Sequence, residues 1–235
     1  MSCDAVEWIE YKGVKLWKFS GSDAYFYTTK RMAIDADGAP NAYRADDRGI
    51  DALANAGYPN GKNWRDIIVP DPANKNTAYV QTSGEYKGFF VSKTTLEDST
   101  LPATDHRRYV DSNKIPYIVF PGAFYKLKGT GNFGDIAAAY NLSNDKKSSV
   151  IVADAGEMNH ELGEVSIKLA ENLGGQNVNP RNGKGMPGGT CVYVVFPKSH
   201  FTPKWRLTTK QIEDKSNQLL SEIGGWERIL ECVGR

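Results

Sequence analysis

The chain has 235 residues, of which 40% are hydrophobic and 24% are charged, and its formal net charge is +1. These values are typical of one large folded domain or two small ones, and they provide no global attraction to nucleic acid or to a membrane surface. No stretch approaches the ~18 apolar residues that span a bilayer. We therefore expect neither a nucleic-acid partner nor a membrane partner, and any electrostatic preference must be local.

The N-terminal segment, MSCDAVEWIEYKGVKLW, lacks the apolar core of a secretory signal peptide. We expect the protein to be intracellular or exported by a route that this sequence does not show. The three cysteines, Cys3, Cys191 and Cys232, have no CxxC spacing and no paired histidines nearby, which argues against a structural zinc site. One disulfide is possible, but the odd count and the wide spacing favour free thiols.

Short strand-like segments bounded by turns dominate the chain. Residues 14–19 alternate, residues 24–29 are aromatic and β-branched, and residues 32–34 lead into the acidic segment after them. Further short apolar runs cover residues 115–120, 136–140, 149–153 and 190–196. Residues 79–83 and 88–92 could also pair as strands. The pattern predicts a mainly β fold with flanking helices (α+β), built as a barrel or a compact mixed sheet.

Two longer helices are expected near the end of the chain. The first is predicted from apolar residues at i, i+3, i+7 and i+11, before a Gly pair; they are Leu162, Val165, Leu169 and Leu173. The second runs from a Thr208 cap to Ile223, and residues 226–233 add a last short turn. Residues 1–200 then form a single domain, with residues 201–235 as a helical segment packed on it.

The stretch VIVADAGEMNHELGEVSIKLAENLGG, residues 150–175, concentrates acidic groups after a strand. Glycosidic bond cleavage needs two carboxyl groups in different protonation states, ~6.5–9.5 Å apart in inverting enzymes and ~5–5.5 Å apart in retaining ones. Asp154, at a strand end, and Glu164, after a turn, suit this chemistry. A structural explanation is also sufficient, because acids favour helix N-termini and Glu164 could pair with Lys168 at i,i+4.

A second acidic stretch holds five aspartates between residues 35 and 51. Its start, Asp35-Ala-Asp-Gly, resembles a calcium loop, but the fifth and sixth loop positions would be Ala39 and Pro40. We expect no metal site, and these acids either line a substrate site or form Asx turns. The aromatic residues Tyr43, Tyr58 and Trp64 could stack on sugar rings or belong to the core.

The motifs IDADG, IPYIVFPGAF, GDIAAAYN, VADAG and LGEVSIKLAENLG occur in this order between residues 32 and 197. In this order they resemble fungal-type chitosanases of glycoside hydrolase family 75. The resemblance implies essential carboxylates at Asp154 and Glu164, with Asp35 and Asp37 as further acids of the cleft. It also implies an inverting mechanism and a six-stranded double-psi-like β-barrel with flanking helices.

The resemblance leaves several roles open within this site. Glu157 and Glu161 remain alternatives for the second carboxylate, or bind substrate together with Tyr43. We expect Glu164 to be the general acid and Asp154 the general base, although the two roles could be exchanged. His160 could tune a nearby carboxylate, but a solvated turn histidine is the simpler interpretation.

The implied function is that of a monomeric endo-chitosanase that hydrolyses β-1,4 bonds between glucosamine units without a cofactor. Chitosan is a polycation, and a local acidic groove would attract it. One alternative is a hydrolase of bacterial peptidoglycan, or an antibacterial effector, on the same scaffold. It is motivated by the missing signal peptide and by residues 201–235, which have no counterpart in the family. A second alternative is a non-catalytic glycan-binding barrel, because fold does not determine function.

Overall fold

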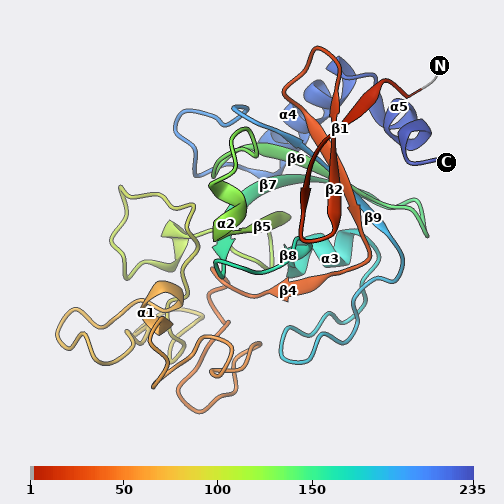
Figure 1. The fold of residues 1–235 in the computed structure, drawn as a ribbon. Helices are drawn as coiled ribbons and strands as arrows, with labels where there is room; N and C mark the ends of the chain where they lie inside the picture. The colour runs from red at the N-terminus through yellow and green to blue at the C-terminus, as the bar shows by residue number, and fades with distance from the viewer. Residues whose placement is uncertain (1–2) are drawn as a thin grey trace.

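The computed structural model describes residues 3–235 as one mixed sheet of nine strands flanked by short helices (Figure 1). The strands are β1 (Ala5–Tyr11), β2 (Val14–Phe19), β3 (Tyr25–Thr29), β4 (Ala33–Asp35), β5 (Tyr117–Pro121), β6 (Ile136–Asn141), β7 (Lys147–Gly156), β8 (Glu164–Ser166) and β9 (Cys191–Phe196). The helices are α1 (Trp64–Ile67), α2 (Gly122–Tyr125), α3 (Ile167–Asn172), α4 (Thr209–Glu222) and α5 (Gly225–Cys232), with a 3-10 turn at His106–Arg108.

The mainly β, α+β class is confirmed, but the six-stranded double-psi-like barrel is wrong. The strand order is β1-β2-β3-β9-β6-β7-β5-β8-β4, and the sheet is open. The N-terminal hairpin lengthens the sheet on one side, because β3 pairs antiparallel with β9. The other side ends at β4, a three-residue strand that runs parallel to β8. Neither edge strand turns back to meet the other, so no closed ring of strands forms.

Most predicted strands are confirmed, with changes at their ends. The run at residues 149–153 extends in both directions to give β7. Residues 79–83 and 88–92 do pair, through the Gln81 N–H to the Phe89 carbonyl at 2.8 Å and the Gly88 N–H to the Gln81 carbonyl at 2.9 Å. They form only an isolated bridge outside the nine-stranded sheet.

The first predicted helix is wrong in its first half. Residues 164–166 form β8 between β4 and β5, so the helix begins only at Ile167, with the Ser166 hydroxyl accepting the Leu169 N–H at 3.1 Å. Glu164 therefore lies on a strand, and the expected i,i+4 pair with Lys168 does not form. Lys168 pairs with Glu171 instead, at 3.7 Å. Pairing with two strands outweighs a helical apolar pattern here, as tertiary context often does.

Residues 201–235 pack against the sheet through α4 and α5. Thr208 caps α4 by accepting the Gln211 N–H at 3.2 Å, and the Gln211 side chain completes a capping box. Ile212 and Leu220 of α4 are buried, and the Ser216 hydroxyl donates to the Ala137 carbonyl of β6 at 3.0 Å. None of the helices in residues 3–235 is both long and apolar enough to cross a membrane.

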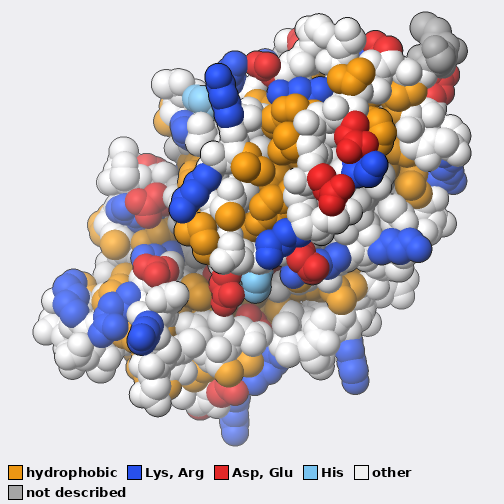
Figure 2. All heavy atoms as spheres, viewed as in Figure 1, with side chains coloured by type: hydrophobic (Ala, Val, Ile, Leu, Met, Phe, Trp, Pro, Cys, Tyr) orange, Lys and Arg blue, Asp and Glu red, His pale blue; other side chains and the backbone are white. Residues whose placement is uncertain are grey.

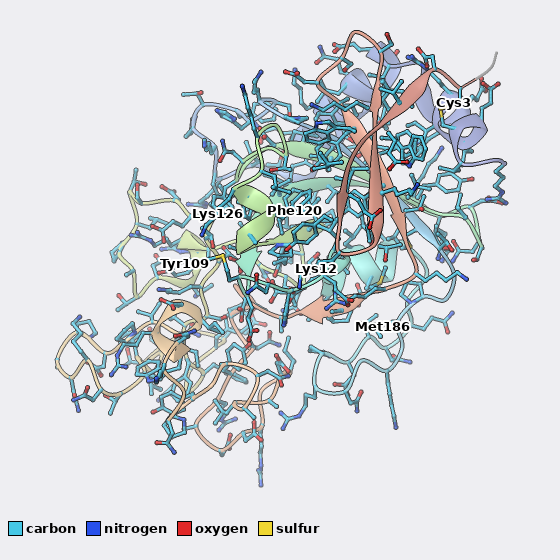
Figure 3. The ribbon with its side chains drawn as sticks, in the orientation of Figure 1. Cys3, Lys12, Tyr109, Phe120, Lys126 and Met186 are labelled. Atoms are coloured by element: carbon cyan, nitrogen blue, oxygen red, sulfur yellow. A yellow bond between two sulfur atoms is a disulfide. The ribbon has the colours of Figure 1, made fainter. Side chains whose placement is uncertain are left out.

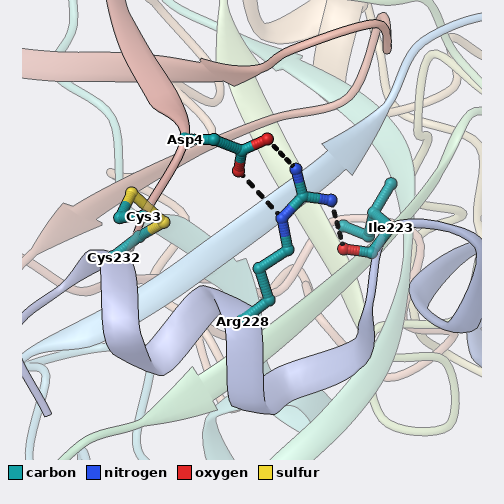
Figure 4. Close-up of a disulfide and its surroundings, with 5 residues drawn as sticks. All are labelled: Cys3, Asp4, Ile223, Arg228 and Cys232. Carbon is teal, nitrogen blue, oxygen red and sulfur yellow. Dashed lines mark hydrogen bonds and ion pairs between the residues drawn. A yellow bond between two sulfur atoms is a disulfide. The ribbon is translucent and has the colours of Figure 1, made fainter. Parts of the chain in front are cut away.

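The expectation of free thiols is wrong for two of the three cysteines. Cys3 and Cys232 form a disulfide across 229 residues, with Cα atoms 4.7 Å apart, while Cys191 is free and buried. Beside the disulfide, Arg228 pairs with Asp4 and also donates to the Ile223 carbonyl at 2.9 Å (Figure 4). The fold brings the first strand to the last helix, which spacing along the chain cannot show. Disulfides of this kind persist in oxidising compartments.

The two faces of the sheet carry different covers. On one face α3 packs on residues such as Ile118 and Val152, and on the other α4 packs on Val119 and Ile151. Residues 36–113 form a loop lobe with α1, at the lower left of Figure 1 and opposite α4 and α5. In Figure 3, Tyr109 marks the chain near the end of this lobe, and Met186 marks the loop between α3 and β9.

Candidate active site

A β-bulge near the end of β7 decides where Asp154 points. Val152 packs on the α3 side of the sheet and Ala153 on the α4 side, so strict alternation would send Asp154 into the α3-side core. The pairing of β7 with β5 skips Ala153, and Asp154 lies opposite Val119, which belongs to the α4 side. Bulges of this kind re-aim a side chain and are frequent beside active sites.

Glu164 reaches the same face from the other side of β5. It pairs with Val119, so Asp154, Val119 and Glu164 form one row across three strands. Neighbouring strands lie ~4.8 Å apart, which puts the Cα atoms of the two acids ~10 Å apart. The two acidic side chains therefore leave the sheet on one face, on either side of Val119.

Gly156 of β7 leaves room for the Glu164 carboxylate. A Cβ at this position would lie 3.0 Å from Oε2 of Glu164 and 3.4 Å from a methyl group of Val119. Gly156 is two residues beyond Asp154, a distance of ~6.6 Å along the strand. The Glu164 carboxylate thus leans over β7, the strand that carries Asp154.

Asp154 is only 7% exposed, and one of its carboxylate oxygens is held firmly. Oδ1 accepts the Thr95 N–H at 2.8 Å, the Thr95 hydroxyl at 2.6 Å and the Ala155 N–H at 2.8 Å. Oδ2 accepts no hydrogen bond from residues 3–235. Burial raises the pKa of Asp154 to about 6, with the three hydrogen bonds opposing the rise and Glu164 adding to it. A proton on Oδ2 would leave all three bonds intact.

The IDADG segment brings two more carboxylates to Asp154. Oxygens of Asp35, Asp37 and Asp154 all lie within 4.8 Å of one another. Asp35 accepts the Asp37 N–H at 2.8 Å on Oδ1 and the Tyr117 hydroxyl at 3.0 Å on Oδ2. Burial raises the pKa of Asp35 and of Asp37 well above the ordinary range, and repulsion among the three acids raises both further.

The glycine of the same motif explains how the chain leaves β4 at this point. Asp35 is the last residue of β4 and pairs with Ser166 of β8. Gly38 then has φ 76°, and a Cβ there would lie 2.0 Å from the Val110 carbonyl oxygen. Only glycine satisfies both conditions, so the motif needs it to place Asp37 beside Asp35.

Tyr43 lies beneath the acids and presents its hydroxyl to two of them. The hydroxyl oxygen is 2.8 Å from Oδ1 of Asp37 and 3.2 Å from Oδ2 of Asp51. The Tyr43 side chain is 2% exposed, so its ring face is not available for stacking on a sugar. Trp64 is equally buried, in the core of the loop lobe, where Tyr58 packs on it edge to face.

Basic side chains lie around Glu164. Burial raises the pKa of Glu164, while Arg31 and His160 oppose that rise and Glu157 adds to it. His160 Nε2 lies 3.1 Å from Oε2 of Glu157, and Arg31 Nε lies 3.1 Å from Oε2 of Glu161. Within residues 3–235 the Glu164 carboxylate accepts no hydrogen bond, so its position is less restricted than that of Asp154.

The acidic groups surround a cavity of about 410 Å³ that the sheet and the loop lobe form together. Figure 2 shows acidic side chains and a histidine gathered where the lobe meets the body of the sheet. The carboxylates that line the cavity are Asp35, Asp37, Asp51, Asp154, Glu157 and Glu164. His160 is the only basic residue of the lining in the described part of the chain. Acidic groups are therefore concentrated in this cavity, although the net charge of the whole protein is +1.

The predicted site residues come together with one exception. Glu161 lies outside the cavity lining, because its side chain turns to Arg31. His160 is half-exposed on the turn, close enough to Glu164 to affect its pKa. Sequence analysis missed Thr95 and Tyr117 altogether. Thr95 stands in an ordinary loop and Tyr117 in an apolar strand, and neither position carries a local signal.

A metal ion is not required to explain the acidic cluster. Three carboxylates within 4.8 Å are the beginning of a cation site, but Ca²⁺ takes six to eight oxygen ligands. Both oxygens of Asp35 and one oxygen of Asp154 already accept protein hydrogen bonds. We therefore assign no metal ligands here.

No protein-family model matches the chain, and no curated protein matches it either. The function is therefore argued from the residues of the site.

Proposed function

We propose that the protein is an inverting glycoside hydrolase that cleaves a polymer of glucosamine, such as chitosan, within the chain. The observation that carries this proposal is the row of Asp154, Val119 and Glu164 at the floor of an acidic cavity. Two carboxyl groups on one face, held apart by an intervening strand, are what glycosidic hydrolysis by acid and base requires.

The placement of the two acids agrees with inversion. They leave the sheet on one face, on either side of Val119, and Glu164 leans over Gly156. In inverting enzymes the carboxyl groups are ~6.5–9.5 Å apart and a water molecule stands between one of them and the sugar. In this cavity the attacking water would approach the anomeric carbon from the side of Glu164.

The surroundings of the two acids favour Asp154 as general acid and Glu164 as general base, the reverse of the order expected from the sequence. Asp154 has a pKa raised to about 6 and stands among other acids, so it retains a proton longer. Arg31 and His160 favour the ionised form of Glu164. Acid and base are distinguished by environments that push their pKa values apart.

The charge of the cavity supports a cationic sugar. A glucosamine unit carries an ammonium group at acidic pH, and the lining offers six carboxylates against one histidine. Peptidoglycan, with its lactyl and peptide carboxylates, would be repelled by the same surface. Focusing of the field inside a concave site strengthens this preference at low salt.

The test is product analysis on partly acetylated chitosan, with the anomeric configuration of the new reducing ends followed by NMR. We expect shorter oligomers that form initially as the α-anomer from a β-linked substrate. Products that start as the β-anomer would contradict inversion. Release of muropeptides from purified sacculi with no cleavage of chitosan would mean that peptidoglycan is the substrate. Binding of chitosan without new reducing ends would exclude catalysis.

A further inference from the structure

If every acid near Asp154 is ionised, the cluster has fewer hydrogen-bond donors than acceptors. The Tyr43 hydroxyl has one proton, but it lies within hydrogen-bond distance of both Asp37 and Asp51, at 2.8 Å and 3.2 Å. A phenol donates only one hydrogen bond. One of these two carboxylates is therefore left without that donor at any moment.

The same shortage recurs at Tyr117, whose hydroxyl lies 3.0 Å from Oδ2 of Asp35 and 2.9 Å from the Asp37 carbonyl. This hydroxyl also faces two acceptors with one proton. Ser92 can give its proton to Oδ1 of Asp37, 3.3 Å away, because the Ile67 carbonyl already accepts the Lys93 N–H at 2.8 Å. Buried acceptors without donors are destabilising, so the cluster gains stability by taking up a proton.

Asp51 is better supplied with donors than Asp37. Its Oδ1 accepts the Ala52 N–H at 2.7 Å and the Asn55 amide at 2.6 Å, which favour the ionised form. Asp37 accepts only from the Tyr43 and Ser92 hydroxyls, both on Oδ1, and its Oδ2 accepts no hydrogen bond from residues 3–235. Since Asp37 also has an oxygen within 4.8 Å of an oxygen of Asp154, the extra proton belongs between these two acids.

We propose that Asp37 is a positioning residue that shares one proton with Asp154 and restores it from solvent after each turnover, with Tyr43 holding Asp37 in place. This inference rests on the proposed function. In the step, water adds to the anomeric carbon and gives a proton to Glu164, the glycosidic C–O bond breaks, and Asp154 gives the shared proton to the leaving oxygen. Asp37 then takes up a proton from solvent, which it again shares with Asp154, while Glu164 releases one to solvent.

Several titratable groups face this pair from the elements around it. They are Asp35 of β4, Tyr43 and Asp51 of the loop lobe, Tyr117 of β5, Tyr125 of α2, Glu157 and His160 of the β7–β8 loop, and Glu164 of β8. Asp35 and Asp37 both contact a shared hydroxyl and lie in the group of three acids with Asp154. Both oxygens of Asp35 already accept a hydrogen bond, whereas Oδ2 of Asp37 accepts none from residues 3–235. A change at Asp37 should therefore act on proton delivery.

The test compares chitosan with a chitooligosaccharyl fluoride, whose leaving group needs little help from an acid. We expect Asp37→Asn to lower kcat on chitosan about tenfold or more, a part of the 10²- to 10⁴-fold that general acid catalysis contributes. The loss on the fluoride should be at least ~10-fold smaller. The alkaline limb of the pH profile should move to lower pH, because an amide that donates to Asp154 favours its ionised form.

Tyr43→Phe should show the same pattern with a smaller loss, and it keeps the test open if Asp37→Asn does not fold. The matched control is Tyr140→Phe, which removes a 2.8 Å bond to Asp145 outside the cavity and should change neither substrate's turnover. Equal losses on chitosan and on the fluoride, or a change in KM alone, would mean that Asp37 binds substrate or maintains the fold, and the inference would be overturned. Wild-type protein that is inactive on both substrates would instead refute the proposed function, and the inference with it.

Discussion

The two halves of the cavity hold the same kind of group in opposite surroundings. Asp154 is fixed by three hydrogen bonds to one oxygen and stands beside buried Asp35 and half-buried Asp37. Glu164 accepts no hydrogen bond from residues 3–235 and has Arg31 and His160 among its neighbours. The comparison teaches that the row of strands only sets the spacing of the acids, whereas the loops on either side decide which of them holds a proton.

Removing either carboxyl group should have the largest effect on activity. Asp154→Asn and Glu164→Gln should each lower kcat on chitosan by about 10²- to 10⁴-fold, since each removes one proton transfer. On the fluoride substrate the Asp154→Asn variant should recover much of its activity, and Glu164→Gln should not. Recovery by Glu164→Gln instead would restore the opposite assignment of acid and base.

The next largest effect should be on the free energy of unfolding, and it should come from the half of the cavity that holds Asp154. Burial raises the pKa of Asp154 to about 6, so ionising this group above that pH destabilises the folded protein. Its protonated form stabilises the fold at low pH, and that contribution is lost as the pH rises from the ordinary aspartate range through about 6. We expect Asp154→Asn to raise the free energy of unfolding by up to about 3 kcal/mol at pH 8, measured by urea denaturation. The gain should vanish near pH 3, and a gain that is independent of pH would contradict this origin.

A methyl group at Gly156 should disturb Glu164 but not Asp154. A Cβ there would lie 3.0 Å from Oε2 of Glu164, so Gly156→Ala should displace the base and lower kcat by roughly tenfold. Gly188→Ala is the matched control, because no atom lies within 4 Å of its Cβ position. Loss of activity in both variants would show that the effect does not arise from Glu164.

The smallest effects should be shifts of opposite limbs of the pH profile of kcat/KM. Thr95→Val removes one hydrogen bond that favours ionised Asp154, so the alkaline limb should move to higher pH. Arg31→Gln removes a cation that favours ionised Glu164, so the acid limb should move to higher pH. If both substitutions move the same limb, the two acids do not have separate roles.

The sequence-based predictions succeeded where a local pattern carries the structure. Alternation and apolar runs identified β2, β6 and β9, and a Thr cap identified the start of α4. The acidic motifs identified Asp35, Asp37, Asp154 and Glu164, which do line one cavity. The predictions failed where long-range pairing overrides a local preference, as in residues 164–166, and where two ends of the chain meet, as at Cys3 and Cys232.

By itself, the sequence determined the class of the fold and the position of most strands, because these depend on side-chain type and short-range spacing. The acids of the cavity were selected by the resemblance of the motifs that contain them. Only the tertiary structure decided that Asp154 and Glu164 share a face, since a bulge at Ala153 reverses the alternation of β7. It also decided their different proton affinities. Those proton affinities depend on Thr95, Tyr43 and Arg31. All three lie far from both acids in the sequence, and they come near the acids only when the sheet and the loop lobe assemble.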